Sequence, residues 1–532
     1  MKTNNLPKLN VDFNKFQPIL KPIYITETTF AYSFLEFKYN KDISKYELKL
    51  LYYEGIRQIL KDAGFFKRYL SNKKSILIRK VGCFIEEVSK EQIIDAFQEF
   101  VYSIKKPFEF EYYASKKIND DVAFTKYSIP VAAIQNTFLK QSHNIFNDRW
   151  LEHLDIETTP ILKDTKKKAN FVFRNCVVTV SKNDGIEIND LSNISEYVVW
   201  KDQFIDKDFT YISDNRKNEF AKFLINVTNG IDNRFEAMCS AIGYLSHNYF
   251  DPSKGVAVVL YDEAITDVKS PMGGTGKGLI ANALKHFRKT TKIDGKLMVD
   301  TNRFKFELVN PDTQIIWFDD PKKDFAFESL FSCLTDGWTI ERKHLPQFFI
   351  QPDDSPKVLI CSNVILNRKG TSNLRRQFTV ELNDYYSKQL VNGTETPIAK
   401  EHGMLFKEEW LEAEWNSFFS FMIDNVHLYL REGFVLYQTK NVEANFLIQN
   451  TNEDFVEFMS DKNFKLDEWH DTKIACDEFV KLYYGEDSNF KQRGFTNWLK
   501  LYAKSINVEY DKSNSGGITK FILISPTKQE TK

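Results

Sequence analysis

The sequence predicts an α/β protein of several domains, with a domain built on a parallel sheet near the middle of the chain. The apolar run 256–261 is followed by a glycine-rich loop and by a segment of helical period, which gives the order strand, loop, helix. Two later apolar runs, 314–320 and 357–363, end in polar residues, as strands buried on both faces of a parallel sheet often do. A length of 532 residues corresponds to about three or four domains.

Composition and charge limit the class of protein. Hydrophobic residues make up 42% and aromatic residues 15% of the chain, so large cores can be buried and global disorder is not expected. The net charge is -1, so any contact with nucleic acid requires a local basic patch. The six cysteines form no C-x-x-C pair, which indicates neither a zinc ribbon nor a disulfide framework and favours a cytoplasmic location. No apolar run has membrane-spanning length and no signal-peptide core is present, so no membrane partner is expected.

The first part of the chain predicts a small α+β region. Residues 1–45 are expected to form an irregular arm, and residues 109–160 are expected to be mostly helical. Between them a helix, a strand pair around Gly82 and a second helix are predicted. A helix followed by a hairpin occurs both in small DNA-binding domains and in ordinary α/β units, and both interpretations stay open. Asp155 and Glu157 are the acidic pair that most resembles a primase metal site, but the polar context favours a solvated helix end.

A connector is predicted next. The charged stretch 163–168 is expected to be a linker, and 171–180 is expected to be one strand that leads into a hairpin turn at 183–185. Asn233 and Glu236 have the spacing of a capping box, which predicts the start of a helix.

The glycine-rich loop gives the clearest chemical signal. Glycines allow backbone N–H groups to turn inward around an anion, and Lys277 can reach the β- and γ-phosphates of a nucleotide. The match to G-x-x-x-x-G-K-[ST] is incomplete, because Pro271 replaces the first glycine and Gly278 replaces the hydroxyl residue that binds Mg²⁺. Taken alone, the loop is equally an ordinary surface turn. The candidate phosphate-binding residues are Gly273, Gly274, Thr275, Gly276, Lys277 and Gly278.

Asp319 and Asp320 end the apolar run 314–320. Ligands of a parallel sheet bind at the carboxyl ends of its strands, so this pair is a candidate catalytic pair. Asp319 is expected to hold Mg²⁺ through water, and Asp320 is expected to orient or deprotonate the attacking water. An acidic turn before Pro321 is the alternative interpretation.

Asn363, Arg375 and Arg376 follow the third apolar run. Asn363 ends that run and can hold the catalytic water or the γ-phosphate. One of the two arginines can reach the γ-phosphate of a neighbouring subunit as an arginine finger. The alternatives are a turn residue and a solvated basic turn.

The segment 339–350 predicts a β-hairpin with a cationic tip. Arg342, Lys343 and His344 stand between two apolar flanks. Such a tip is suited to contact with a phosphate backbone.

The C-terminal residues predict a further helical unit. The stretch 404–437 is rich in aromatic residues and has helical spacing. Beyond it, three helical patterns precede two strands, which is the order of a winged helix. Lys491, Arg493, Lys500 and Lys504 either face DNA or form a solvated surface, and both interpretations stay open.

The order of phosphate loop, Asp-Asp strand, basic hairpin, Asn strand and arginine pair resembles that of superfamily 3 helicases. These are the AAA+-like hexameric replicative helicases of viruses, phages and plasmids, and the likeness is greatest to the primase–helicase proteins of phages and mobile elements. A Gly-Thr-Gly-Lys-Gly loop also occurs in that family. The likeness covers roughly residues 235–390, with a weaker likeness over about 45–235. It includes no polymerase-type primase domain, so it does not imply priming activity.

The resemblance implies an AAA+-like P-loop ATPase core, with ATP and Mg²⁺ as cofactors and single-stranded or forked DNA as the partner. It implies a homo-oligomer, a hexamer in that family, and assigns DNA contact to Arg342, Lys343 and His344. A primase or an origin-binding protein is a further partner that it allows. The expected divisions are an α+β N-terminal region (1–165), a collar-like connector (166–234), the helicase ATPase domain (235–390), a helical segment (391–450) and a winged-helix-like domain (451–532).

The leading hypothesis is therefore an ATP-dependent replicative DNA helicase of a phage, plasmid or mobile element that moves on DNA as a ring. The alternative is an ATP-switched replication initiator or loader that binds DNA without processive unwinding. The acidic pair Asp319 and Asp320 favours turnover over a static switch.

Overall fold

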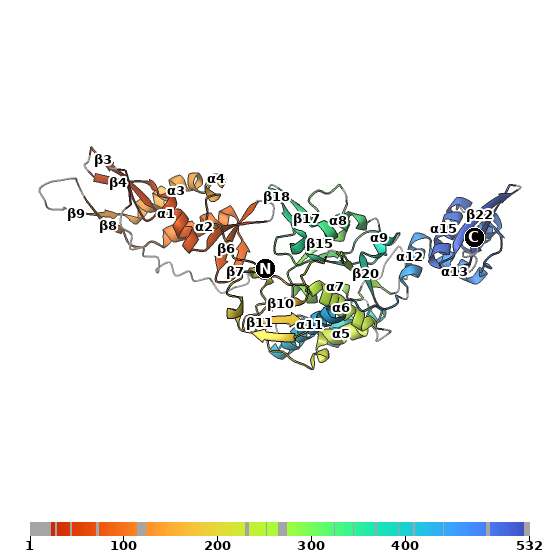
Figure 1. Ribbon diagram of the computed structural model, residues 1–532. Coiled ribbons are helices and arrows are strands. Elements are labelled where there is room, and N and C mark those ends of the chain that lie inside the picture. The colour runs from red at the N-terminus through yellow and green to blue at the C-terminus, as the bar shows by residue number, and fades with distance from the viewer. Residues whose placement is uncertain are drawn as a thin grey trace. The chain divides into compact units, whose positions relative to one another are not determined.

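The computed structural model forms two compact units, Met1–Leu162 with Leu191–Phe204, and Lys163–Asp190 with Ile205–Lys532 (Figure 1). We call these unit 1 and unit 2. Within them the structure describes residues 23–26, 29–42, 45–70, 74–113, 124–228, 233–251, 253–263, 274–299, 301–323, 325–343, 345–367, 370–391, 393–407, 410–439, 441–485, 490–515 and 517–525.

Unit 1 combines an antiparallel sheet, a second sheet in which one pair of strands is parallel, and a hairpin with helices. Buried aromatic side chains, including Phe34, Phe97, Phe138 and Phe146, form its main core. A four-stranded sheet is built from β1 (Ile23–Thr26), β2 (Thr29–Tyr32), β3 (Leu35–Asn40) and β4 (Lys45–Leu51). The second sheet consists of β5 (Phe65–Tyr69), β6 (Ser75–Val81), β7 (Phe84–Glu87) and β13 (Val199–Trp200), and β13 pairs with β7 in parallel. The hairpin pairs β8 (Phe108–Tyr113) with β9 (Phe124–Ile129). The helices are α1 (Tyr53–Asp62), α2 (Lys90–Ser103), α3 (Val131–Ile145) and α4 (Asp148–Leu151).

Three expectations for unit 1 are corrected. The described part of the supposed irregular arm is a sheet, because Leu35 and Phe37 alternate with more exposed residues and are buried on one face. The stretch 109–160 is not mostly helical, since the β8–β9 hairpin occupies its first part. Asp155 does not lie at a solvated helix end: its carboxylate pairs with Arg57 and Lys61 beside a β-bridge between Lys67 and Ile156. This acidic residue therefore has a structural role.

Unit 2 is organised around a five-stranded sheet in which every neighbouring pair is parallel. The prediction of a parallel sheet is confirmed. β14, the strand of this sheet that comes first in the sequence, lies between β19 and β20. The loop that follows β14 therefore begins inside the sheet rather than at its edge. The strands, in spatial order, are β15 (Thr290–Asp294), β16 (Ile315–Asp319), β19 (Lys357–Cys361), β14 (Ala257–Asp262) and β20 (Gln377–Leu382).

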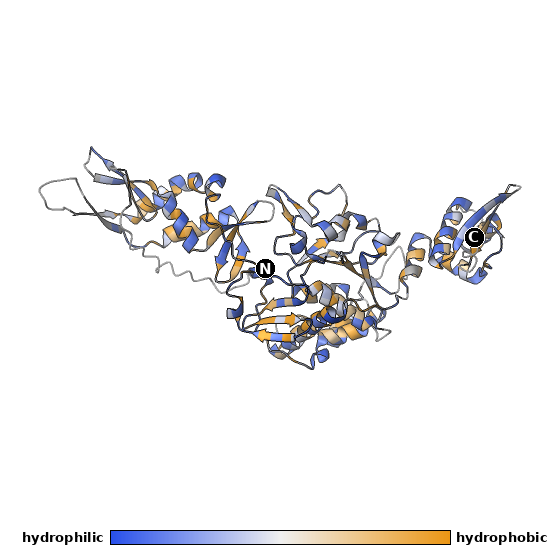
Figure 2. Ribbon diagram, in the orientation of Figure 1, coloured by the Kyte–Doolittle hydropathy of each residue, from blue (hydrophilic) through white to orange (hydrophobic). Residues whose placement is uncertain are grey.

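Helices and a second small sheet share one hydrophobic core with the central sheet. Figure 1 shows α5, α6, α7 and α11 gathered beside β10 and β11, and Figure 2 shows apolar residues concentrated on these strands and helices. The elements are α5 (Glu219–Thr228), α6 (Arg234–Ser246), α7 (Lys277–Lys285), α11 (Glu412–Glu432), β10 (Lys168–Val172), β11 (Val177–Ser181) and β12 (Gly185–Asn189).

Here too the structure corrects the local predictions. The single strand expected over 171–180 is two antiparallel strands, β10 and β11, although the turn before Gly185 is present as predicted. Asn233 does not cap α6, because its backbone is left-handed (φ 61°) and its side chain accepts no capping bond. The stretch 163–168 is no free linker: Asp164 is buried and forms an ion pair with Arg288.

The remaining elements of unit 2 connect or extend the sheet. The basic hairpin is present as β17 (Trp338–Arg342) and β18 (Leu345–Ile350), and it lies between β16 and β19 in the chain. Short helices are α8 (Phe331–Asp336), α9 (Thr371–Leu374) and α10 (Pro397–His402), and α12 (Val442–Asn450) precedes the C-terminal elements. Among the described helices, none is both long enough and apolar enough to cross a membrane.

The C-terminal elements have their own core around Phe455, Phe479 and Phe495. The three predicted helices and the final strand pair are confirmed, and a short strand that joins their sheet was not predicted. The order is α13 (Glu453–Lys462), β21 (His470–Asp471), α14 (Thr472–Tyr483), α15 (Gln492–Ser505), β22 (Glu509–Ser515) and β23 (Ile518–Ile524), with β23 at the centre of the sheet.

Candidate nucleotide-binding site

The loop after β14 leads directly into α7, whose first residue is Lys277. Gly274 and Gly276 both have left-handed backbone conformations, with φ of 98° and 100°. A Cβ atom on Gly276 would lie 2.4 Å from Cζ of Phe223, so both the conformation and the space require glycine there. Gly273, the first glycine of the predicted set, lies outside the described residues.

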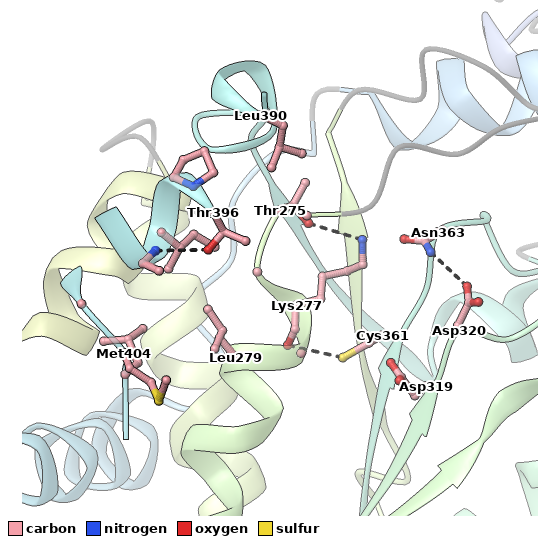
Figure 3. Close-up of a pocket in the computed structure, with 18 residues that line it drawn as sticks. Thr275, Lys277, Leu279, Asp319, Asp320, Cys361, Asn363, Leu390, Thr396 and Met404 are labelled. Atoms are coloured by element: carbon pink, nitrogen blue, oxygen red, sulfur yellow. Dashed lines mark hydrogen bonds between the residues drawn. The ribbon is translucent and has the colours of Figure 1, made fainter. Parts of the chain in front are cut away.

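A cavity of about 510 Å³ opens in front of this loop. The loop residues that line it are Gly274, Thr275, Gly276, Lys277 and Gly278. Figure 3 shows that Asp319, Asp320 and Asn363 lie on one side of Lys277, whereas Leu390, Thr396 and Met404 lie on the other. The cavity therefore has an acidic side and a largely apolar side, with a cation between them.

The acidic side lies where β16 and β19 end, as the sequence predicts for a parallel sheet. Asp319 is the last residue of β16, and its carboxylate lies 2.7 Å from Nζ of Lys292. The Asn363 amide donates a hydrogen bond of 2.9 Å to Oδ1 of Asp320. Lys296 lies 2.5 Å from Asp320, and the hydrogen bond between them raises the pKa of Lys296.

Lys277 itself pairs with a residue that the sequence analysis did not single out. Its Nζ lies 2.5 Å from Oδ1 of Asp262, the last residue of β14, and donates a longer bond of 3.4 Å to the Thr275 hydroxyl. All three side chains are buried. A carboxylate that ends the first apolar strand is the sequence signal that could have found Asp262.

Cys361, the last residue of β19, borders the cavity. Its thiol donates to the backbone oxygen of Lys277 at 3.7 Å, and burial raises the pKa of Cys361 to about 12. The side chain is therefore a neutral thiol at physiological pH, not a nucleophile.

The apolar side of the cavity comes from residues well beyond the predicted motifs. Leu390, Ile398 and Met404 lie in the segment around α10, and Leu390 and Met404 are exposed. A buried hydrogen-bond network holds this segment: the hydroxyl of Tyr386 and Nε2 of His402 are 2.6 Å apart, and Nδ1 of His402 lies 2.8 Å from a carboxylate oxygen of Glu219.

The arginine pair does not line the cavity of this chain. Arg375 is exposed at the end of α9. Arg376 instead packs its guanidinium over the ring of Phe331 at 4.4 Å and donates to the Ser372 carbonyl, and burial lowers the pKa of Arg376. The two neighbouring arginines thus have different surroundings.

The basic residues of the β17–β18 hairpin also differ from one another. Arg342 donates to Oδ1 of Asn310 at 2.7 Å and its guanidinium lies over the Phe348 ring, so this arginine braces the hairpin against the rest of unit 2. Lys343 is exposed at the turn, and His344 lies outside the described residues. Of the predicted DNA-contacting residues, Lys343 is the one described side chain that projects into solvent.

The cavity has the size and the backbone geometry of a small-molecule site. Its volume is in the range of small-molecule sites, and the two left-handed glycines form the kind of cradle that a phosphate requires. Among the described residues no group of three or more His, Cys, Asp or Glu side chains is arranged to hold a metal ion.

Comparisons with known proteins find similar solved structures but no related family or curated protein. No protein-family model and no curated protein matches the chain. Solved structures that are similar include the apo form of the NrS-1 C-terminal region (TM-score 0.39, 11% identity, 88% of this chain and 99% of that one). They also include the JCV helicase, with a TM-score of 0.23 and 12% identity over 50% of this chain and 65% of that one. A third is the Drosophila ORC bound to DNA, with a TM-score of 0.18 and 10% identity over 61% of this chain and 93% of that one. TM-scores and identities this low do not establish a shared function.

Proposed function

We propose that this protein is an ATP-dependent DNA helicase that assembles into a ring. The observation that supports this most is the position of Lys277. It begins α7 and lines the cavity, between the acidic pair at the end of β16 and the apolar segment around α10.

In this proposal each side of the cavity meets a different part of ATP. The glycine cradle and Lys277 bind the phosphates, and the apolar side chains of Leu390, Ile398 and Met404 cover the base. Asp319 holds Mg²⁺, which when bound neutralises charge on the phosphates. Asp320, held by the Asn363 amide, orients the attacking water.

The hairpin offers a route from nucleotide to DNA. It is the chain segment between β16, which ends at Asp319, and β19, which precedes Asn363. A movement of either strand end is therefore passed along the chain to the exposed turn at Lys343. In a ring, this turn would repeat around a central channel and supply the local basic patch that the net charge of -1 does not.

Two further features support assembly and DNA contact. The exposed Arg375 is free to act on the nucleotide of a neighbouring subunit, which would explain why it does not line its own cavity. The C-terminal order of helix, strand, two helices and a hairpin is that of a winged helix, and we assign it to DNA contact. A hexamer is the ring size that the resemblance to superfamily 3 helicases suggests.

The test is ATP hydrolysis by the full chain with and without single-stranded DNA, together with unwinding of a forked duplex. Lys277→Ala should abolish both activities, whereas Lys285→Ala, at the exposed end of the same helix, should retain them. Hydrolysis without DNA stimulation or unwinding would favour the ATP-switched initiator or loader. Absence of nucleotide binding in the wild-type protein would overturn the proposal.

A further inference from the structure

The ion pair between Lys277 and Asp262 has a consequence for how the cavity binds nucleotide. Asp262 ends β14, immediately before the loop, and its side chain is 6% exposed. Its Oδ1 atom lies 2.5 Å from Nζ of Lys277 and also accepts a 2.5 Å hydrogen bond from the Thr275 hydroxyl. One carboxylate oxygen therefore meets the cation and the hydroxyl at the centre of the candidate phosphate site.

The two carboxylates that line the cavity, those of Asp319 and Asp320, have other partners. Asp319 pairs with Lys292 and Asp320 pairs with Lys296, and strand β19 separates β16, which ends at Asp319, from β14, which ends at Asp262. The side chain of Lys277 is 9% exposed, so water gives its ammonium group little solvation. A buried cation without a counter-ion is strongly destabilising, and Asp262 supplies that counter-ion when no phosphate is present.

We infer that Asp262 acts as an internal anion that occupies the place of the phosphate charge at Lys277 in the empty site and gives the lysine up when nucleotide binds. This inference rests on the proposed nucleotide site. The carboxylate stabilises the empty form, and its negative charge also repels an incoming phosphate. Both effects weaken nucleotide binding, which suits an enzyme that must release its product in every cycle.

A purely structural role makes a different prediction. Asp262 and Thr275 stand at the two ends of the loop, so their hydrogen bond also closes it. If closing the loop were the whole role, neutralising Asp262 would lower stability and loosen the phosphate cradle, and nucleotide affinity would fall or stay unchanged. An internal anion predicts instead that neutralising Asp262 raises nucleotide affinity, since removal of the charge destabilises the empty form more than the occupied form.

The experiment compares the full wild-type chain with Asp262→Asn, using ADP as the ligand in calorimetric titration and in thermal unfolding. We expect ADP to bind about tenfold more tightly to the variant, equivalent to about 1.4 kcal/mol. The empty variant should melt at a lower temperature than the empty wild type, and saturating ADP should narrow this difference. Asp262→Glu, which keeps the charge, should bind ADP with nearly wild-type affinity.

Asp164→Asn is the matched control. Asp164 is a buried carboxylate that pairs with Arg288 at 2.9 Å, outside the cavity. This control should lower the melting temperature and leave ADP affinity unchanged. Equal or weaker ADP binding by Asp262→Asn would overturn the inference, whereas a wild-type protein that binds neither ADP nor ATP would overturn the proposed function instead.

A structure of the wild-type protein with ADP decides the matter if Asp262→Asn does not fold. The internal-anion role requires that Nζ of Lys277 leave Asp262 for a phosphate oxygen. An ion pair that remains at 2.5 Å in the ADP complex would contradict that role.

Discussion

At the scale of single residues, the acidic side of the cavity contains one residue with an unusual backbone conformation. Asp320 has a φ of 50°, in the left-handed region that aspartate enters at some energetic cost. Its N–H donates to the Cys361 carbonyl at 3.0 Å, and its carboxylate accepts from the Asn363 amide. These bonds fix Asp320 between the ends of two neighbouring strands, where a water-orienting carboxylate is required by the proposed mechanism.

Asp320→Asn should retain nucleotide binding and lose turnover by about 100-fold or more, because the amide keeps the shape but cannot act as a base. The measurement is ADP affinity alongside the rate of ATP hydrolysis. Asp353→Asn, an exposed position outside the cavity, is the control and should have the wild-type rate. If Asp320→Asn loses affinity while Asp319→Asn keeps it, the metal-holding and water-orienting roles are reversed.

The two arginines after α9 should respond differently to alanine. Arg376→Ala removes a guanidinium that lies over Phe331, and it should destabilise the protein by about 1 kcal/mol in thermal unfolding. Arg375→Ala should leave the melting temperature unchanged, because the side chain is exposed, and should lower hydrolysis about 1,000-fold in the assembled ring. Normal hydrolysis by Arg375→Ala at concentrations where the protein is oligomeric would exclude this residue as the arginine finger.

At the scale of elements, the β17–β18 hairpin combines a fixed base with an exposed turn. Trp338 and Ile340 are buried in β17, and Phe348 and Ile350 are buried in β18. Arg342 anchors the hairpin near its turn through Asn310. The exposed Lys343 therefore sits on a rigid support, which is what a DNA contact coupled to strand movement needs.

Lys343→Ala should weaken binding to single-stranded DNA and reduce the salt dependence, with a slope smaller by about 0.7 per subunit contact that is lost. The measurement is DNA affinity at several salt concentrations, with the unwinding rate recorded in parallel. Lys182→Ala changes an exposed lysine in the turn between β11 and β12 and should leave both quantities unchanged. Identical salt slopes for wild type and Lys343→Ala would mean that DNA is held elsewhere.

At the scale of the whole molecule, unit 2 buries several charges within its core. Arg288 pairs with Asp164 and lies over the Phe171 ring at 3.9 Å, which connects the segment between α7 and β15 to the small β10–β12 sheet. Lys357, at the start of β19, donates to the Tyr249 carbonyl at 2.6 Å. Burial lowers the pKa of Lys357 from 10.5 to about 8.

Lys357 should therefore make the stability of unit 2 depend on pH. Below pH 8 the lysine is charged in the folded and the unfolded chain alike, and burial of that charge opposes folding. Between pH 8 and 10.5 the unfolded chain binds a proton that the folded chain has lost, so this group's contribution to stability rises with pH, by up to about 3 kcal/mol. Lys357→Met should be more stable than wild type at pH 7, and the difference should shrink as pH rises to 9.5. The measurement is the free energy of unfolding in urea at several pH values. A constant difference in this free energy between the two proteins from pH 7 to 9.5 would contradict the prediction.

The sequence by itself determined the features that depend on local patterns. Buried parallel strands need continuous apolar runs, and the loop after β14 needs glycines with left-handed backbone, so both could be recognised without a fold. The same holds for the β17–β18 hairpin and the C-terminal helices, whose periodicity is local. The sequence also placed Asp320 and Asn363 each at the end of an apolar strand, and the structure brings the two side chains together where strand ends meet at one edge of the parallel sheet.

Only the tertiary structure decided which distant residues complete the site. The pairing of Asp262 with Lys277 and the apolar side chains around α10 depend on how the chain returns to the loop, which no local period encodes. The burial of Asp164 had the same origin: a charged stretch is solvated unless a partner such as Arg288 meets it inside the core. Electrostatic pairing acts between groups close in space, whereas the sequence shows only which groups are close along the chain, and this is why the counter-ion of Lys277 emerged from the fold alone.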